Sequence, residues 1–248
     1  MAETTSEQVS LMFSGGVDST TAALALSRRF ETVHLLTYGN GYGHYKLERT
    51  RRRVRELRRF ADARLVHTIS SSRELFEHLL VDDVKAEFKR YGSGFVWCLG
   101  CKLAMHTASV LYCLEHGIGV MADGSSRSTG EMVEQSLLSL YMFREFYASF
   151  GIEFTTPVYD IPREEEIRKL EQQGFRMGLR VLDRFLGVQP KCRAGELYYL
   201  PFLLFDQPPA HDDDQVADFI ERKTAVAREL VQRRCAERGW PDRIGEAA

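Results

Sequence analysis

Two groups of residues in this chain of 248 have types and spacing that suit chemistry. The first is the segment Ser14-Gly15-Gly16-Val17-Asp18-Ser19-Thr20, which joins a short apolar run to a helical pattern. The second is a set of three cysteines: Cys98 and Cys101, with two residues between them, and Cys192, with 90 residues between it and Cys101. The first group predicts an anion-binding loop, and the second predicts a thiol site.

The glycine segment suits a phosphate group. Two adjacent glycines permit a tight turn and a close approach of backbone amides to an anion. The helix that follows directs its free N–H groups and its positive dipole end at the same point. Ser14, Ser19 and Thr20 add hydroxyl donors. The pattern is neither the Walker A motif nor Gly-x-Gly-x-x-Gly, and a plain helix-capping turn is the alternative interpretation.

Ser-Gly-Gly-Val-Asp-Ser directly after a first strand resembles the pyrophosphate loop of the PP-loop, or N-type, ATP pyrophosphatases. Members of that superfamily cleave ATP between the α and β phosphates and adenylate a substrate oxygen. The resemblance implies ATP and Mg²⁺ as ligands and a catalytic role for Asp18. It places the adenine between the first two strands, near Leu36, Thr37 and Tyr38. The implied phosphate and magnesium ligands are Ser14, Gly15, Gly16, Asp18, Ser19 and Thr20.

The cysteine pair begins an apolar helical pattern, and a helix N-terminus is expected to lower thiol pKa values. A PP-loop, a Cys-x-x-Cys pair and a later single cysteine resemble the iron–sulfur-dependent tRNA thiolation enzymes of the 2-thiocytidine and 2-thiouridine synthetase type. The resemblance implies a [4Fe–4S] cluster on Cys98, Cys101 and Cys192 with one iron left open. It also implies catalytic roles for Cys101 and Cys192, a sulfur donor, and an acceptor that is either tRNA or a nucleobase-like small molecule.

Other uses of the cysteines stay open. Zinc requires a fourth ligand, for which His106 and Cys113 are candidates. A persulfide carrier requires only two cysteines, such as Cys101 and Cys192, and no metal. Cys113 and Cys235 lie in helical patterns, where buried packing is the simpler interpretation.

The chain also departs from the thiolation enzymes. It has no further cysteine pairs, and its fourth strand runs into Met121–Arg127 where those enzymes have a Gly-His-x-x-Asp-Asp segment. Asp123 then either binds magnesium or orients the acceptor, which gives it a catalytic role, or it only begins an Asp-Gly turn. We expect Lys102 to be a surface lysine, although its position beside Cys101 also suits charge neutralisation. The arginine-rich stretch Lys46–Arg59 is a solvated helix, a surface for a tRNA backbone, or a site for a phosphorylated small molecule.

Strand and helix patterns alternate from the start of the chain, which predicts a doubly wound parallel α/β sheet with ligands at the carboxyl ends of its strands. We expect a PP-loop domain over residues 1–162 and a helical C-terminal extension over 163–248 that carries Cys192. The expected strands are Gln8–Phe13, Thr32–Tyr38, Arg64–Ile69, Gly119–Asp123 and Glu153–Val158. The expected helices are Ser19–Arg29, Lys46–Phe60, Arg73–Arg90, Leu99–Glu115, Glu131–Ser149, Arg163–Gln173, Met177–Leu186 and Gln215–Arg238, with a polar break at Pro208-Pro209 and Asp212–Asp214.

Composition narrows the function classes. The formal net charge is −2, so non-specific nucleic-acid binding through bulk charge is not expected. Five cysteines are too few, and odd in number, for a disulfide-stapled secreted scaffold, which favours a cytoplasmic location. The longest apolar stretch, Leu197–Phe205, has nine residues with a proline inside and is too short for a membrane helix, which needs about 20 residues. No membrane partner is expected, and a homodimer stays open.

Together these patterns predict an ATP-dependent enzyme that adenylates a carbonyl oxygen of a nucleobase-like acceptor and replaces that oxygen with sulfur. One alternative is a PP-loop ligase that forms an amide or a nitrile and uses its cysteines structurally. Another is a nucleotide-binding redox sensor.

Overall fold

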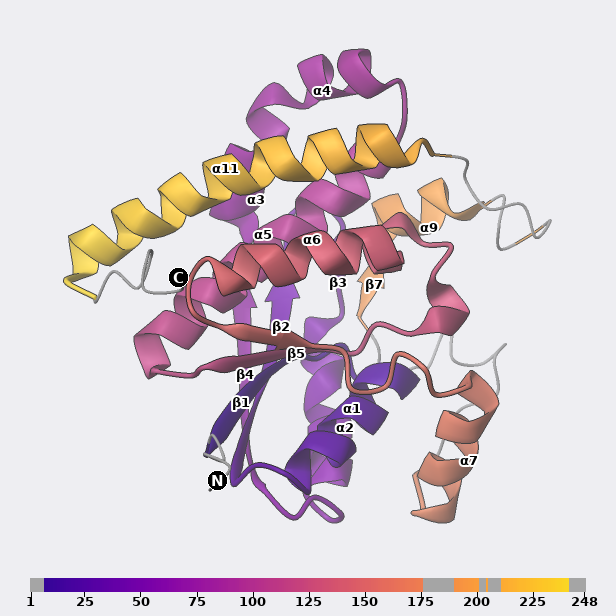
Figure 1. Cartoon of the computed structure of the whole chain (residues 1–248). Helices are drawn as coiled ribbons and strands as arrows, with labels where there is room; N and C mark the ends of the chain where they lie inside the picture. The colour runs from indigo at the N-terminus through magenta and orange to yellow at the C-terminus, as the bar shows by residue number, and fades with distance from the viewer. Residues whose placement is uncertain (1–6, 176–189, 201–203, 205–210, 241–248) are drawn as a thin grey trace.

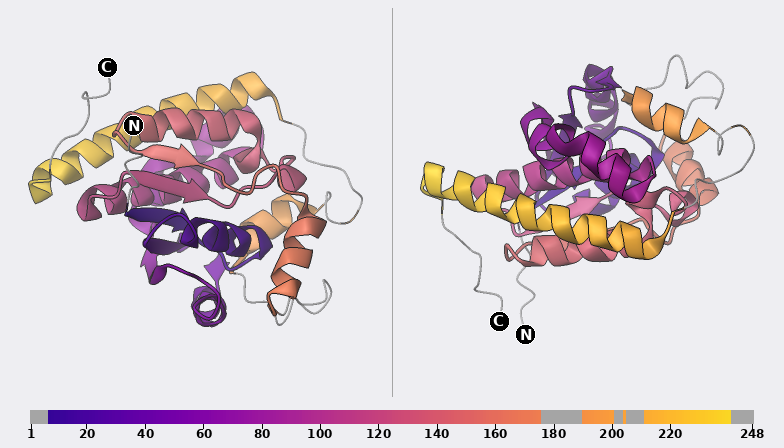
Figure 2. Two further views of the ribbon diagram at one scale, coloured as in Figure 1. Left: turned by 60° about the horizontal axis from the view of Figure 1, so that its bottom comes forward. Right: turned by 90° about the horizontal axis from the view of Figure 1, so that it is seen from above.

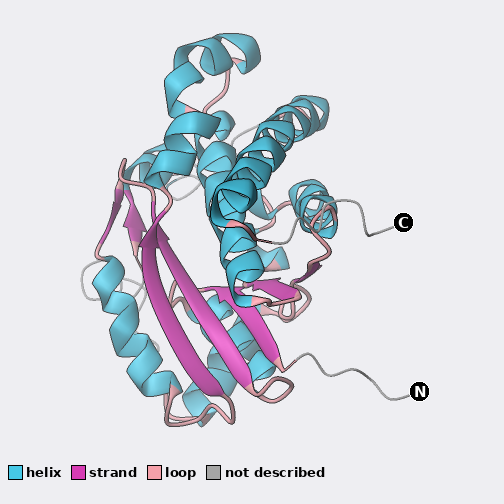
Figure 3. Cartoon of the chain, turned by 90° about the vertical axis from the view of Figure 1, so that its left-hand side faces the viewer, coloured by secondary structure: helices cyan, strands magenta, loops and turns pink. Residues whose placement is uncertain are grey.

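The structure is a computed structural model that describes residues 7–175, 190–200, 204 and 211–240. Its centre is a parallel sheet of five strands in the order β4-β2-β1-β5-β6 (Figure 1). Helices cover both sides of the strands (Figure 3). The predicted doubly wound α/β fold with a helical C-terminal region is therefore confirmed. The strands are β1 (Gln8–Met12), β2 (Thr32–Gly39), β4 (Arg64–Ser71), β5 (Val120–Asp123) and β6 (Glu153–Thr155).

Two sets of helices form the outer layers. One side of the sheet carries α1 (Val17–Ser27), α2 (Thr50–Leu57) and α7 (Arg163–Gln172). The other side carries α3 (Arg73–Leu79), α5 (Phe95–His116), α6 (Leu137–Ala148) and α11 (Asp213–Arg238), with α4 (Val84–Tyr91) packed against α5. The helix α11 lies across α5 and α6 (Figure 2). The division into two domains at residue 162 stays a prediction.

Each layer has its own apolar core, and side chains of β1 and of Phe13, the next residue, contribute to both. Val9, Leu11 and Phe13 pack with α1 on one side, whereas Met12 packs with the α5 layer on the other. All four side chains are buried. A strand covered on both faces reads as a continuous apolar run, which is why β1 is readable from the sequence.

The central helix α5 explains most of the apolar character of the second layer. Among the described residues it alone is long and apolar enough to cross a membrane, and 61% of its most apolar stretch is buried inside the fold. Polar residues such as Lys102 and His106 divide its apolar sequence, so α5 has no single long apolar stretch. Its apolar face is a core face, packed against α3 and α11.

A second, two-stranded sheet joins distant parts of the chain. The strand β3 (His44–Tyr45) pairs antiparallel with β7 (Lys191–Cys192), and α9 (Arg193–Tyr198) follows directly. Neither His44–Tyr45 nor Lys191–Cys192 is among the strands that the sequence predicts. Two-residue strands have no periodicity to read, and their pairing is a long-range contact. The predicted helix Met177–Leu186 and the Pro208-Pro209 break lie outside the described residues.

The reversal of strand order at β1 fixes where a ligand can bind. Met12 at the end of β1 pairs with Leu36 of β2 on one side and with Asp123 of β5 on the other. The crossovers leave β1 in opposite directions, and this opens a crevice at the carboxyl ends of the strands. The Ser14–Thr20 loop and Asp123 therefore meet at one point.

Gly124, directly after β5, makes this meeting possible. A Cβ atom at position 124 would lie 2.8 Å from Ser19 Cα and 2.9 Å from Ser19 N. We predict that Gly124→Ala displaces the start of α1, weakens ATP binding and lowers the free energy of unfolding by about 1–3 kcal/mol. Denaturant unfolding and ATP titration measure both effects. The control is Gly119→Ala, whose Cβ would meet nothing within 4 Å; equal behaviour of the two variants would contradict the prediction.

Candidate active site

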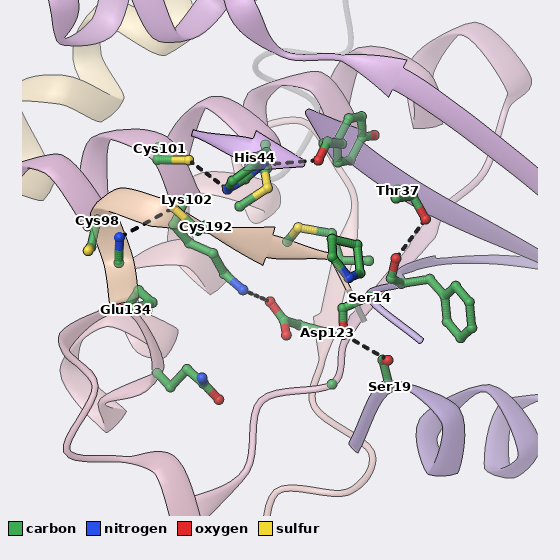
Figure 4. A pocket seen from close by; sticks show the side chains of 18 of the residues that line it. Ser14, Ser19, Thr37, His44, Cys98, Cys101, Lys102, Asp123, Glu134 and Cys192 are labelled. Atoms are coloured by element: carbon green, nitrogen blue, oxygen red, sulfur yellow. Dashed lines mark hydrogen bonds and ion pairs between the residues drawn. The ribbon is translucent and has the colours of Figure 1, made fainter. Parts of the chain in front are cut away.

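A cavity of about 340 Å³ opens at the carboxyl ends of β1, β2 and β5, and the start of α5 and the β7–α9 segment complete its wall (Figure 4). It brings together most of the residues that the sequence singled out. The predicted site residues that line it are Ser14, Asp18, Ser19, Thr37, Cys98, Cys101, Asp123 and Cys192. Gly15, Gly16 and Thr20 are not among its lining residues.

The loop at the cavity floor has the geometry of an anion site. Gly15 has φ +72°, a left-handed conformation that favours glycine, and Gly16 caps the N-terminus of α1. The Ser14 and Ser19 hydroxyl oxygens lie 3.1 Å apart, and both line the cavity. Thr20 is buried within α1, and its hydroxyl has no hydrogen-bond partner. The start of α1 therefore presents two hydroxyls and its positive end to a ligand.

Two charged side chains of α7 support this loop, and sequence reasoning missed both. Arg163 Nη1 donates to both carboxylate oxygens of Asp18, at 2.8 and 3.1 Å. Glu166 is fully buried beside them. Burial first, and then the neighbouring Asp18 carboxylate, raise the pKa of Glu166 to about 8. The only signal in the sequence was the run of charges that starts this helix.

The predicted adenine side of the cavity is built by β2. Leu36, Thr37 and Tyr38 all line the cavity. The Thr37 hydroxyl donates to the Phe13 carbonyl at 2.7 Å, which ties β2 to the end of β1. Whether a base stacks there stays a prediction, as does the role of each residue in the loop.

The three cysteines reach the cavity from two directions. Cys98 and Cys101 lie in the first two turns of α5, and Cys192 ends β7 and caps α9. All three are free thiols that line the cavity. Cys113 and Cys235 are buried in the core, as expected, and are not among the residues that line the cavity.

The prediction that the helix start lowers the thiol pKa values is wrong. Burial raises the pKa of Cys98 and of Cys192, and it raises the pKa of Cys101 to about 12. The Glu134 carboxylate, which also lines the cavity, adds to the rise at all three. An Asn40 N–H that donates to Cys101 Sγ at 3.1 Å opposes it only in part. These thiols are neutral at pH 7 and need a nearby positive charge to become thiolates.

The three thiols are chemically suited to bind a metal group as thiolates, because all three line one cavity, with Cys101 buried and Cys98 and Cys192 half-buried. In the part of the chain that the structure describes, no three His, Cys, Asp or Glu side chains have the spacing of a preformed metal site. A bound ion or cluster would therefore have to draw these side chains together. His106 and Cys113, the two candidates for a fourth zinc ligand, do not line the cavity.

A buried ion pair separates the phosphate loop from the cysteines. Lys102 Nζ lies 2.6 Å from Asp123 Oδ2, and both line the cavity, so the expectation of a surface lysine is wrong. Burial would raise the pKa of Asp123, but Lys102, His106 and the Ser125 hydroxyl outweigh it and lower that pKa. Asp123 is thus more than a turn residue. The pair places one cation and one anion where an acceptor would lie.

The comparisons with known proteins agree with this architecture. No family model matches the chain, and no curated protein matches it. A 4-thiouridine synthetase, solved with RNA and ATP, superposes with a TM-score of 0.50 at 17% identity over 92% of this chain. Two more solved structures with lower scores are the U34-tRNA thiolase of Methanococcus maripaludis with its [4Fe–4S] cluster (TM-score 0.47, 13% identity, 91% of this chain and 72% of that one) and a predicted subunit of tRNA methyltransferase from Methanocaldococcus jannaschii (0.42, 16%, 66% and 74%).

This chain has the PP-loop fold. The shared sheet and the Ser-Gly-Gly-Val-Asp-Ser loop at the end of β1 establish that fold. The chain spans 53% of the length of the 4-thiouridine synthetase. The likeness at 17% identity therefore supports the PP-loop fold and says nothing about the activity of this chain.

The buried Glu166 makes stability depend on pH. Its pKa is about 8 in the folded protein against an ordinary 4.5, so unfolding releases a proton between these values and stability falls as pH rises through that range. We predict that Glu166→Gln flattens this fall, because the amide stays neutral. Thermal unfolding from pH 5 to 9 measures it, with the exposed Glu164→Gln as the control. Parallel curves for wild type and Glu166→Gln would refute the prediction.

Proposed function

We propose that the protein is an ATP-dependent thiolation enzyme that adenylates a carbonyl oxygen of a nucleobase-like acceptor and replaces it with sulfur. One observation carries this proposal: a single cavity is lined both by the phosphate loop and by three cysteines. A nucleotide-binding site alone needs no thiols on its wall, and a metal site alone needs no phosphate loop.

In the first step, the β and γ phosphates of ATP would bind at the start of α1, where Asp18 would hold Mg²⁺, and that ion would neutralise charge on the phosphates. The acceptor oxygen attacks the α-phosphorus, and an O–P bond forms as the bond to pyrophosphate breaks. Arg163 donates hydrogen bonds to both carboxylate oxygens of Asp18 and so fixes the orientation of that side chain. Fixed amides and hydroxyls stabilise the charge that builds on the phosphates without having to reorient.

In the second step, a sulfur nucleophile attacks the activated carbon, and the C–O bond breaks as AMP leaves. The Lys102–Asp123 pair lines the cavity between the Ser14–Thr20 loop and the cysteines, and it orients the acceptor there. When bound, a [4Fe–4S] cluster on Cys98, Cys101 and Cys192 would supply an iron that holds the incoming sulfide. The buried walls exclude water, which would otherwise hydrolyse the adenylate.

The acceptor is proposed to be a nucleobase, either in tRNA or in a small molecule. The 4-thiouridine synthetase of the same fold was solved with RNA and ATP bound, which supports an RNA base. The exposed face of α2 and the turn that follows it offer positive charge for a phosphate backbone, from Arg51, Arg52, Arg55, Arg58 and Arg59.

The test is an anaerobic reaction with ATP, labelled sulfide and either tRNA or free nucleobases as acceptor. We expect AMP and pyrophosphate to form only with the right acceptor, and the label to appear in that acceptor. Pyrophosphate without incorporated sulfur would instead favour an amide- or nitrile-forming ligase. Absence of acceptor-dependent pyrophosphate would reject both enzymes and favour a sensor.

Substitutions in the loop test the first step by itself. Gly16→Val blocks the approach of the phosphates to the backbone, and Asp18→Asn removes the magnesium-binding charge. We predict that each lowers the rate of pyrophosphate release by about 100-fold or more while the circular dichroism spectrum is unchanged. Asp160→Asn, on an exposed carboxylate, is the control. Normal turnover by either loop variant would remove the assignment of the loop.

A further inference from the structure

The β3–β7 ladder has an outer face that the proposed function does not use. Successive side chains of a strand point to opposite faces, and partners across a ladder share a face. His44 and Cys192 are register partners, and both line the cavity (Figure 4). The next pair, Tyr45 and Lys191, therefore lies on the outer face of the same two-stranded ribbon.

The Tyr45 ring holds two cations on this outer face. Lys46 Nζ lies 5.3 Å from the centre of the ring, and the guanidinium carbon of Arg193 lies 5.4 Å from it. An aromatic ring attracts a cation that lies over its face. One ring thus brings together a lysine that follows β3 and an arginine that follows β7.

The backbone fixes both cations in place. Among the described residues, Lys46 is the only one other than glycine with a positive φ, +62°. This left-handed backbone is strained for a residue with a Cβ atom, and it turns the chain from β3 into the short helix η1 (Leu47–Arg49). The Arg193 N–H donates to the Gly43 carbonyl at 3.2 Å, so the start of α9 is tied to the residue before β3.

Neighbouring carboxylates neutralise these cations only weakly. In the part of the chain that the structure describes, Lys46 and Arg193 form no ion pair, and Lys191 forms one, with Glu196 at 4.0 Å. The Glu196 side chain is 41% exposed, and an exposed pair at that distance contributes little. Lys191 also lines the cavity, so the three cations border it.

The positive charge continues along the chain into α2. Eight of the fourteen residues from Lys46 to Arg59 are lysine or arginine, and two are glutamate. The chain as a whole carries a net charge of −2, so this excess is local. A ligand with several phosphates can contact the ladder and then this stretch.

A phosphate of the acceptor is the anion that the position of these cations favours. A nucleobase that enters the cavity leaves its ribose and its phosphate outside. Ammonium and guanidinium groups bind phosphate oxygens through charge-assisted hydrogen bonds, and a guanidinium can bind two oxygens at once. A free nucleobase or a nucleoside offers these groups no charge.

We propose that Lys46, Lys191 and Arg193, here called the ladder cations, bind a phosphate group of the acceptor. This inference rests on the proposed function and narrows it, because it makes the acceptor a nucleotide rather than a free base. The base lies in the cavity, and the phosphate lies on the outer side of the β3–β7 ribbon. A free nucleotide and a nucleotide within RNA share this chemistry, and experiment distinguishes the two sources.

Isothermal titration calorimetry on the whole protein tests the ladder cations. Saturating α,β-methylene ATP and Mg²⁺ are present, so that the Ser14–Thr20 loop is occupied. The titrants are ribonucleosides, their 5′-monophosphates and a short single-stranded RNA. We expect a monophosphate or the RNA to bind about 10-fold or more tightly than the matching nucleoside. Lys46→Gln combined with Arg193→Gln should abolish that preference and leave the affinity for nucleosides unchanged.

Two control variants separate a phosphate contact from a change in net charge or in folding. Lys89→Gln combined with Arg233→Gln removes the same charge from exposed positions on α4 and α11, which contribute no residue to the cavity, and should keep the preference. Arg193→Lys keeps the charge on the ladder and should retain most of the preference. A role of Arg193 only in holding the ladder would instead weaken the binding of nucleosides and phosphates alike.

The outcomes separate this inference from the proposed function. Equal affinity of wild type for a nucleoside, its monophosphate and RNA overturns the ladder site, as does a preference that survives the Lys46 and Arg193 substitutions. Acceptor-dependent pyrophosphate release by the same preparation then shows whether the proposed function still stands. Phosphate-dependent binding without such release would support the ladder site and reject the proposed function.

The titrants also identify the source of the phosphate. If the substitutions weaken only the binding of RNA, the ladder cations bind a phosphodiester backbone. If they weaken the binding of monophosphates as well, the ladder cations also bind a free nucleotide. Either result supports the ladder site.

Discussion

The site depends on two residue pairs of a short antiparallel ladder. His44 pairs with Cys192, and Tyr45 pairs with Lys191, residues that are nearly 150 positions apart in the chain. Without this ladder, Cys98 and Cys101 would face a phosphate loop but no third thiol. The ladder also places the start of α9 so that the Gly195 N–H donates to Cys192 Sγ at 3.4 Å. The parallel sheet builds the half of the cavity at the Ser14–Thr20 loop, which the proposed function assigns to the nucleotide (the nucleotide half). The helix α5 and the ladder build the half that carries the cysteines (the sulfur half).

The two halves of the cavity favour ligands of opposite charge. The loop at the start of α1 lies at the positive end of the helix dipole, which favours binding of an anion. On the cysteine side, burial and the nearby Glu134 carboxylate raise the pKa values of the thiols, which are therefore neutral. A bound cation would stabilise them as thiolates. Lys102 and Asp123 lie between the halves as a neutral pair. Under the proposed function, this division of charge keeps the phosphates and the metal group apart in one cavity and leaves the space between them to an uncharged acceptor.

The nucleotide half was readable from the sequence, because it is local. A buried strand, two glycines and a helix start lie within a dozen consecutive residues, and the strand–helix alternation fixes the carboxyl edge where they lie. Asp123 followed from the same rule. The sulfur half was readable only as a cysteine spacing. Arg163, Arg193 and Gly124 act through contacts across the fold, which leave no periodic signal. The thiol pKa values and Lys102 were misjudged because burial, which sequence position alone does not give, outweighed the helix end and the expected exposure.

Under the proposed function, ATP and the cysteines share one cavity, and a structure of the protein with a non-cleavable α,β-methylene analogue of ATP and Mg²⁺ would reveal whether they do. We expect the terminal phosphates at the start of α1, the adenine beside Leu36–Tyr38, and the α-phosphorus facing an open space bounded by Asp123 and the three cysteines. A nucleotide bound elsewhere would contradict this arrangement. The arrangement would equally be contradicted by a nucleotide on the loop whose α-phosphorus is sealed off from Cys98, Cys101 and Cys192 by ordered protein.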